Sequence, residues 1–212
     1  MSDIYNNYYA EVVIHVVDDD HGVREALNRL LRRAGYAVQL HGSAEEYLQR
    51  YDGAPGGLIL DLLMPKMRGE ALLEEICRRQ HNVAVLVLTA NATIASTIRV
   101  MQAGAFDLLE KPFSTPELLK ALSSVLEKAR PLFAKRALAD EYHQRLAALT
   151  PSERNVMELI VAGYTSQEIA VRLGNSKKTI DIHRSRVIHK MGVASTTELI
   201  KSCVALGQEH GI

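Results

Sequence analysis

The sequence predicts an α/β protein with two domains, in which a doubly wound parallel sheet is followed by a small all-α domain. The first 130 residues alternate short apolar runs with amphipathic helical stretches, and the runs of β type stop there. At 212 residues the chain exceeds the ~150 residues of an average domain, and its 47% hydrophobic content is enough to bury a core. We therefore expect one domain of each type.

The predicted strands are short runs without a polar face. They occupy residues 12–17, 37–40, 58–60, 83–89 and 106–109, with helical patterns at 22–34, 43–50, 69–79, 95–103 and from about 115. Strands that are apolar on both faces and joined by helices indicate a parallel sheet covered on both sides. We place this domain at residues 11–130, preceded by a disordered or extended tail at residues 1–10.

The remainder of the chain has only helical patterns. Residues 131–148 keep a helical spacing of apolar residues and are predicted to be a helical linker, with Pro131 as a break or a first-turn residue. Four short helices follow at 149–212, and Thr150 with Glu153 has the spacing of a capping box. Residues 131–212 hold 11 basic against 8 acidic residues, whereas residues 1–130 hold 14 against 17. The basic half is therefore the candidate for a polyanionic partner.

Acidic and other polar residues follow four of the predicted strands. Asp18 and Asp19 end the first run, Asp61 the third and Thr89 the fourth, while Lys111 follows the fifth. In a doubly wound sheet, ligands bind beyond the carboxyl ends of the strands, so these five side chains should meet at one edge. Two carboxylates ~4 Å apart repel by roughly 4 kcal/mol at an effective dielectric of ~20, so a compensating cation is expected.

Oxygen ligands with a high negative charge favour Mg²⁺, which binds one or two carboxylates together with waters and a phosphate oxygen. A carboxylate beside such a cation can act as a nucleophile toward a phosphoryl group, whose oxygens a lysine and a hydroxyl would neutralise. This chemistry suits phosphoryl transfer to an aspartate.

Residues 11–130 resemble the receiver domain of two-component response regulators. The resemblance is carried by four features: the acid pair, the D-x-x-M-P at Asp61, the Thr89–Ala90 pair and the KP-F at Lys111. The resemblance implies a flavodoxin-like five-stranded sheet of order 2-1-3-4-5, with Asp61 as phosphoacceptor and Thr89 and Lys111 engaging the phosphoryl group. It also implies a Mg²⁺ site and a cis Lys111–Pro112 bond. The implied metal ligands are Asp18, Asp19, Asp61 and the backbone carbonyl of Leu63.

Two positions depart from the receiver pattern. Leu108, three residues before Lys111, occupies a position that is usually aromatic and serves as a rotamer switch. Leu63, two residues after Asp61, replaces a common polar residue, which leaves less to orient an attacking water. The coupling through a swinging ring and the lifetime of the phosphoryl group are therefore expected to differ from the usual pattern.

In the basic half, two helices flank a tight turn at Gly174, as in a helix-turn-helix. On the second helix, Ile180, Val187 and Met191 recur at helical spacing as a buried stripe, which leaves a basic face exposed. Such a helix is suited to reading the major groove, with its cations on phosphates.

Residues 149–206 resemble the LuxR-type domain, and the whole chain is similar to the FixJ and NarL class, most of all to its FixJ-like branch, whose recognition helix resembles "TIDIHRSRVIHKMG". The residues predicted to contact DNA lie on that helix. Asp181, Ile182 and Ser185 are expected to face bases, and the phosphate side is expected to include Lys177, Lys178, Thr179, His183, Arg184, Arg186 and Lys190. The final helix would turn Leu199, Ile200 and Cys203 toward a second protomer or its own core.

These resemblances imply a cytoplasmic response regulator that is not a conventional enzyme. A histidine kinase would phosphorylate Asp61, the chain would form a homodimer, and the dimer would bind promoter DNA, with RNA polymerase as a further partner and no membrane association. Two alternatives stay open: a phosphatase with an aspartyl nucleophile, which should have an acid where Leu63 stands, and a DNA-binding protein that works without phosphorylation, which Leu108 favours. A LuxR-type autoinducer sensor is disfavoured, because the N-terminal half has phosphorylation residues in place of a ligand cavity.

Overall fold

The computed structural model describes residues 12–207, and the tail predicted at residues 1–10 lies outside them. The chain divides into two compact units between Phe133 and Ala134. Helix α6 (Thr115–Ala147) contributes residues to both. Among the described residues, no helix is both long enough and apolar enough to cross a membrane.

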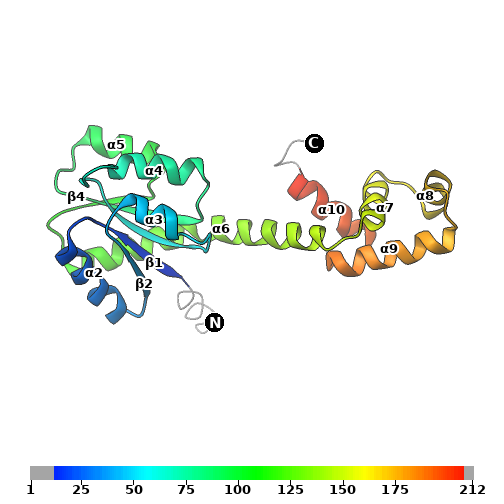
Figure 1. Ribbon diagram of the computed structural model, residues 1–212, viewed down its shortest axis with the longest axis horizontal. Coiled ribbons are helices and arrows are strands. Elements are labelled where there is room, and N and C mark those ends of the chain that lie inside the picture. Colours follow the sequence, from blue (N-terminus) through cyan, green and yellow to red (C-terminus); the bar gives the residue numbers. More distant parts are fainter. Residues whose placement is uncertain (1–11, 208–212) are drawn as a thin grey trace. The chain divides into compact units, whose positions relative to one another are not determined.

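The first unit is built on a parallel five-stranded sheet (Figure 1). Its strand order is β2-β1-β3-β4-β5, as the resemblance to receiver domains implied. Neighbouring strands pair in parallel, with Val17 beside Leu60, Asp61 beside Leu88 and Thr89 beside Glu110. All carboxyl ends therefore lie at one edge. The strands are β1 (Val13–Val17), β2 (Ala37–His41), β3 (Gly56–Asp61), β4 (Val83–Thr89) and β5 (Asp107–Glu110).

Helices cover both faces of this sheet, and each face has its own core (Figure 1). On one face, Ile14, Val16 and Leu86 pack against α2 (His21–Arg33) and the first part of α6. On the other face, side chains such as Leu58 and Leu60 pack against three helices, α3 (Ala44–Arg50), α4 (Gly69–Arg78) and α5 (Ile94–Gln102). Every residue of β4 is buried, which explains why its sequence has no polar face.

Two histidines lie inside the first unit, although their strands read as apolar runs. His15 of β1 and His41 of β2 are 2% and 0% exposed, and His15 Nδ1 lies 3.1 Å from His41 Nε2, so one ring donates a hydrogen bond to the other. The buried ring of Tyr47 packs edge-on against both. Burial, followed by the neighbouring His41, lowers the pKa of His15 to about 4. Burial likewise lowers the pKa of His41 to about 4.

The second unit is a helical bundle around one core, which includes Val156, Ile160, Ile169 and Leu199. Gly174 closes α8 in the left-handed conformation (φ +64°), which favours glycine because it has no Cβ. The helices are α7 (Pro151–Val161), α8 (Ser166–Leu173), α9 (Lys177–Met191) and α10 (Thr196–Gly207).

Pro131 was expected to break a helix or to start one, and that expectation is wrong. It lies inside the 33-residue helix α6, more than a turn beyond its first residue. The end of this helix belongs to the second unit, because Tyr142 and Leu146 pack against the second core. The linker predicted at residues 131–148 therefore includes residues that contribute to the packing of the C-terminal unit.

We expect the buried histidines to make the first unit sensitive to acid. Their folded pKa of about 4 lies below the usual value of 6.5, so the unfolded chain binds more protons between these values. Stability should be complete above pH 6.5 and fall as the pH drops toward 4, by up to ~3 kcal/mol for His15, with a further contribution from His41.

Urea unfolding followed by circular dichroism at pH 7 and pH 5 measures this loss. The double substitution His15→Phe and His41→Phe keeps the aromatic packing and removes both titrations. The variant should lose less stability between the two pH values than the parent chain, and an equal loss would contradict the prediction.

Candidate functional site

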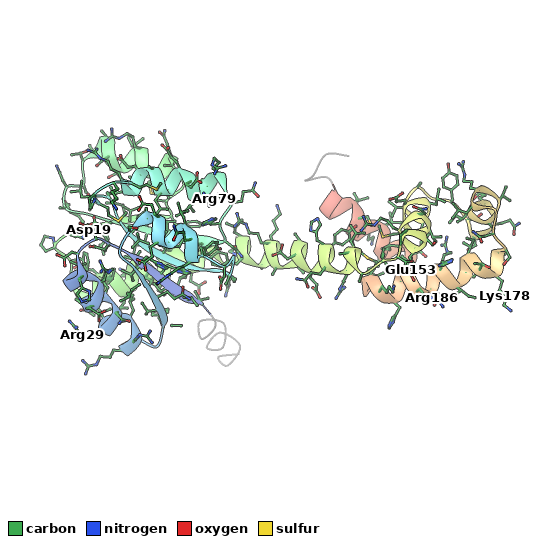
Figure 2. The ribbon with its side chains drawn as sticks, in the orientation of Figure 1. Asp19, Arg29, Arg79, Glu153, Lys178 and Arg186 are labelled. Carbon is green, nitrogen blue, oxygen red and sulfur yellow. The ribbon has the colours of Figure 1, made fainter. Side chains whose placement is uncertain are left out.

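The polar residues predicted to meet at the carboxyl edge of the sheet do so. Asp18 follows β1 directly, Asp61 and Thr89 are the last residues of β3 and β4, and Lys111 follows β5. One carboxylate oxygen from each of Asp18, Asp19 and Asp61 lies within 4.8 Å of the other two. Figure 2 labels Asp19, the exposed member of the three, on the first unit. Parallel register brings together residues that are up to 93 positions apart.

Lys111 connects two of these carboxylates. Its Nζ lies 3.1 Å from Asp61 Oδ2 and 3.4 Å from Asp18 Oδ2. The Asp18 side chain is 3% exposed and that of Asp61 13%. The ammonium group therefore offsets the repulsion between two poorly hydrated carboxylates. The Lys111–Pro112 bond is cis, as the sequence resemblance implied.

Asp18 is held in an environment that disfavours its charge. Burial raises its pKa, while a hydrogen bond from the Asp20 amide (2.8 Å) and the charge of Lys111 act in the opposite direction. Because burial is the largest effect, the neighbouring lysine offsets only part of the cost of the negative charge. A further cation beside Asp18 would therefore be stabilising.

Thr89 and Leu63 lie beside the acids. Thr89 is 4% exposed, and its hydroxyl exchanges long hydrogen bonds with the backbone of Asn91, accepting from the N–H (3.3 Å) and donating to the carbonyl (3.4 Å). The Leu63 amide donates to Asp61 Oδ1 (3.3 Å), while its side chain is 66% exposed. An exposed apolar side chain thus stands next to the acid cluster, where the usual receiver pattern has a polar residue.

Three residues support the site without having been assigned a role from the sequence. Arg24 donates to the carbonyl of Asp18 (2.7 Å), and Asp20 accepts from the Gly22 and Val23 amides at the start of α2 (2.7 and 3.1 Å). Gly69 approaches the backbone of Asp61 so closely that a Cβ there would overlap the Asp61 carbonyl oxygen. The acid run could have suggested the cap at Asp20, but no local pattern marks Gly69 or Arg24.

On the predicted recognition helix α9, the buried stripe is confirmed. Ile180 and Val187 are fully buried and Met191 is 2% exposed. Most of the predicted DNA contacts face solvent on the opposite side, where Ile182 is 46% exposed. Figure 2 labels Lys178 and Arg186 on α9, and both are exposed. The remaining exposed members of the predicted set are Lys177, Asp181 and Ser185.

Four other residues of the predicted set are partly buried. Thr179 exchanges a hydrogen bond with the cap residue Ser176 (2.8 Å). Within the described chain, His183 Nδ1 is buried without a hydrogen-bond partner. Arg184 and Lys190 bond to other elements of their own unit, Lys190 to Glu153 Oε2 (2.7 Å).

The final helix α10 contributes to its own core. Leu199 is fully buried, and Cys203 packs against the same core and accepts a hydrogen bond from the Tyr142 hydroxyl (3.2 Å). For Leu199 and Cys203, the structure therefore supports the intramolecular possibility, whereas Ile200 is partly exposed and is not among the residues of this core.

An acid cluster at the carboxyl edge of a 2-1-3-4-5 sheet, joined in one chain to a basic helix-turn-helix, defines a class of transcriptional regulators. Residues 14–123 match the family described as response regulator receiver domain, and residues 147–203 match bacterial regulatory proteins of the LuxR family. The chain belongs to the response regulators with a LuxR-type DNA-binding domain, in the FixJ-like branch. It is thus a transcriptional regulator and not a classical enzyme, which removes the support for a phosphatase.

Known proteins resemble the chain over most of its length. The transcriptional regulatory protein FixJ of Bradyrhizobium diazoefficiens is 34% identical over 92% of this chain and 95% of its own. FixJ of Rhizobium meliloti is 33% identical over 93% and 97%. The solved response regulator StyR is 33% identical and covers 92% of this chain and 99% of its own, with a TM-score of 0.73.

We expect Gly69→Ala to destabilise the backbone that carries Asp61. The added Cβ would overlap the Asp61 carbonyl oxygen and approach Leu62 Cα to 2.8 Å, and neither backbone atom can move aside freely. Overpacking of this kind costs ~1–3 kcal/mol. Urea unfolding should show that loss, whereas Glu74→Ala, on the exposed side of the same helix, should stay within ~0.5 kcal/mol. Equal stabilities for the two variants would contradict this account.

Proposed function

We propose that the chain is a cytoplasmic response regulator activated by phosphorylation of Asp61. In this proposal a histidine kinase supplies the phosphoryl group, residues 11–130 receive it, residues 131–148 link the domains, and residues 149–212 bind promoter DNA and recruit RNA polymerase. The observation that carries it is the cluster in which Lys111 lies within reach of both Asp18 and Asp61, joined in one chain to a basic recognition helix.

The donor set fits Mg²⁺. Three carboxylates can each turn one oxygen toward a common point, and hard divalent cations prefer such oxygens. The raised pKa of Asp18 supports this fit, because burial leaves the carboxylate in need of positive charge. We propose Asp18, Asp19 and Asp61 as ligands, with the Leu63 carbonyl as a fourth. When bound, the ion would neutralise charge that develops on the phosphoryl oxygens.

Phosphorylation would proceed at Asp61 by displacement at phosphorus. An Asp61 oxygen would form the new P–O bond while the P–N bond to the kinase histidine breaks, and the imidazole would leave with the bonding electron pair and take up a proton. Lys111 would then move from the carboxylates toward the phosphoryl oxygens. Among residues 12–207, the Thr89 hydroxyl is held by long bonds to Asn91 alone, so it can donate to one of the phosphoryl oxygens. The chain's main contribution is positioning and charge neutralisation.

An exposed apolar stripe supports the proposed dimer. Ile94, Ile98 and Met101 of α5 recur at helical spacing and are 83%, 51% and 42% exposed. The helix packs against β5, which leads to Lys111, so a movement of Lys111 can reach this face. Two protomers joined there would present two recognition helices to adjacent half-sites of a near-palindromic operator.

We expect Mg²⁺ to stabilise the chain. At a concentration ten times its dissociation constant, a ligand that binds only the folded state adds ~1.4 kcal/mol. Thermal unfolding with and without MgCl₂ measures the shift, with NaCl at equal ionic strength as the control. Asp19→Asn should abolish it, because the exposed carboxylate supplies charge to the cluster and little packing. A shift that persists in this variant would place the ion elsewhere.

The central test is phosphorylation itself. Incubation with Mg²⁺ and acetyl phosphate should add one phosphate, seen by mass spectrometry as one HPO₃ unit, and increase binding to a DNA duplex selected by the chain from a random pool. Asp61→Asn should do neither. Asp20→Asn is the matched control, because Asn can still cap α2, and it should be labelled like the parent chain. Labelling of Asp61→Asn would overturn the site assignment.

A second candidate function, DNA binding without phosphorylation, is favoured by Leu108. This side chain packs partly buried against the core, in the position where receivers usually have a mobile aromatic ring. In that case, the selected duplex would bind phosphorylated and unmodified chains equally. To move an equilibrium between an inactive and an active state from 1:99 to 99:1, phosphorylation would have to supply ~5.5 kcal/mol of differential stabilisation. The two functions therefore predict very different ratios of DNA affinity between the phosphorylated and the unmodified chain.

A further inference from the structure

The cations of α9 divide into two groups that the sequence does not distinguish. Lys177, Lys178 and Arg186 are exposed, whereas Arg184 and Lys190 are partly buried. Both groups were assigned to phosphate contacts from their position in the family pattern. The contacts of the second group indicate another role.

Lys190 ties the last turn of α9 to the start of α7. Its Nζ donates to Glu153 Oε2 at 2.7 Å and to the carbonyl of Ala148 at 3.1 Å. Glu153 is 3% exposed, and the same oxygen accepts a hydrogen bond from the Thr150 amide (2.9 Å), which caps α7. A buried carboxylate that lost its ammonium partner would be left uncompensated, so these contacts compete with any phosphate for Lys190.

Arg184 ties the middle of α9 to two other segments. Its guanidinium donates to the Tyr164 carbonyl (3.3 Å), in the turn before α8, and to the Thr196 hydroxyl (3.4 Å), at the start of α10. The planar fork of an arginine can reach two acceptors at once, which a single ammonium group cannot do with the same geometry. Arg184 and Lys190 therefore join α9 to the neighbouring segments at two positions along the helix, its middle and its last turn.

We infer that Arg184 and Lys190 are positioning residues that hold the recognition helix in its domain, and that the exposed cations, Arg186 among them, make the phosphate contacts. Base readout depends on the placement of Asp181, Ile182 and Ser185 to within a fraction of an ångström, and a loosened helix would lose sequence discrimination before it lost general affinity for DNA. This inference rests on the proposed DNA binding.

The two roles differ in the salt dependence of binding. The slope of log K against log salt is negative, and removal of one phosphate contact reduces its magnitude by ~0.9. The same removal weakens binding to all DNA sequences alike. Removal of a positioning residue leaves the slope in place and lowers the ratio of specific to non-specific affinity. The probes are a duplex selected by the parent chain from a random pool, and poly(dI-dC), measured by fluorescence anisotropy between 50 and 200 mM NaCl.

For Lys190→Met and Arg184→Met in the full chain, we expect an unchanged slope and a loss of about tenfold in the specificity ratio, the scale of one good base contact. Arg186→Met and Lys178→Met are the matched controls and should lower the slope on both probes. Circular dichroism at the assay temperature verifies folding. Two milder variants remove only the partners: Glu153→Gln and Thr196→Val change no residue of α9, and each should lower the specificity ratio in the same direction.

Lys190→Arg keeps a donor for Glu153, so its ratio of specific to non-specific affinity should be close to that of the parent chain and well above that of Lys190→Met. The inference is overturned if Lys190→Met and Arg184→Met lower the slope as Arg186→Met does, or if the partner variants leave the specificity ratio unchanged. Failure of the parent chain to bind either probe would instead overturn the proposed DNA binding.

Discussion

The candidate site of the first unit depends on one electrostatic arrangement, in which the ammonium group of Lys111 lies between the carboxylates of Asp18 and Asp61. Parallel pairing forces these acids to the same edge, and burial removes much of the water that would otherwise screen them. The lysine satisfies part of this demand for positive charge, since the pKa of Asp18 still lies above its usual value. In the proposed function, a bound cation would supply the remaining positive charge, and a phosphoryl group on Asp61 would draw Lys111 away from the two carboxylates.

This arrangement could be predicted because it follows from strand ends. The apolar runs locate the strands, a parallel sheet aligns their carboxyl ends, and Asp61, Thr89 and Lys111 then have to be neighbours. Gly69 could not be predicted in the same way, since its role comes from the approach of α4 to the Asp61 backbone, which is a tertiary contact. His15 and His41 were missed for a related reason. A strand that is otherwise apolar gives no sign that two imidazoles from neighbouring strands form a buried hydrogen bond with one another.

The recognition helix shows the same limit at the level of single side chains. Helical periodicity identified Ile180 and Val187 as buried, because apolar spacing is a property of the helix alone. It could not separate Arg186 from Arg184, since both lie off the apolar stripe and only the neighbouring turn and α10 decide which of them finds acceptors. Pro131 is a further example. It removes one backbone hydrogen bond from α6, but Ala129 and Phe133 on either side of it pack in the first core, and this packing outweighs the local preference of proline.

Hydrogen bonds at the ends of β4 and β5 offer a direct route from the acid cluster to the exposed face of α5. The Lys111 amide donates to the Thr89 carbonyl at 2.7 Å, so the two residues proposed to engage a phosphoryl group are already joined through the ends of β4 and β5. The Ala92 amide, in the turn that leads into α5, donates to the carboxylate of Glu110, the residue before Lys111. A shift of Lys111 or Thr89 toward new charge would therefore pull on both ends of the β4–α5 connection. Coupling of this kind requires displacement of the backbone and of the Glu110 side chain and no aromatic ring, which is how a receiver with Leu108 could still transmit the proposed phosphorylation to Ile94 and Ile98.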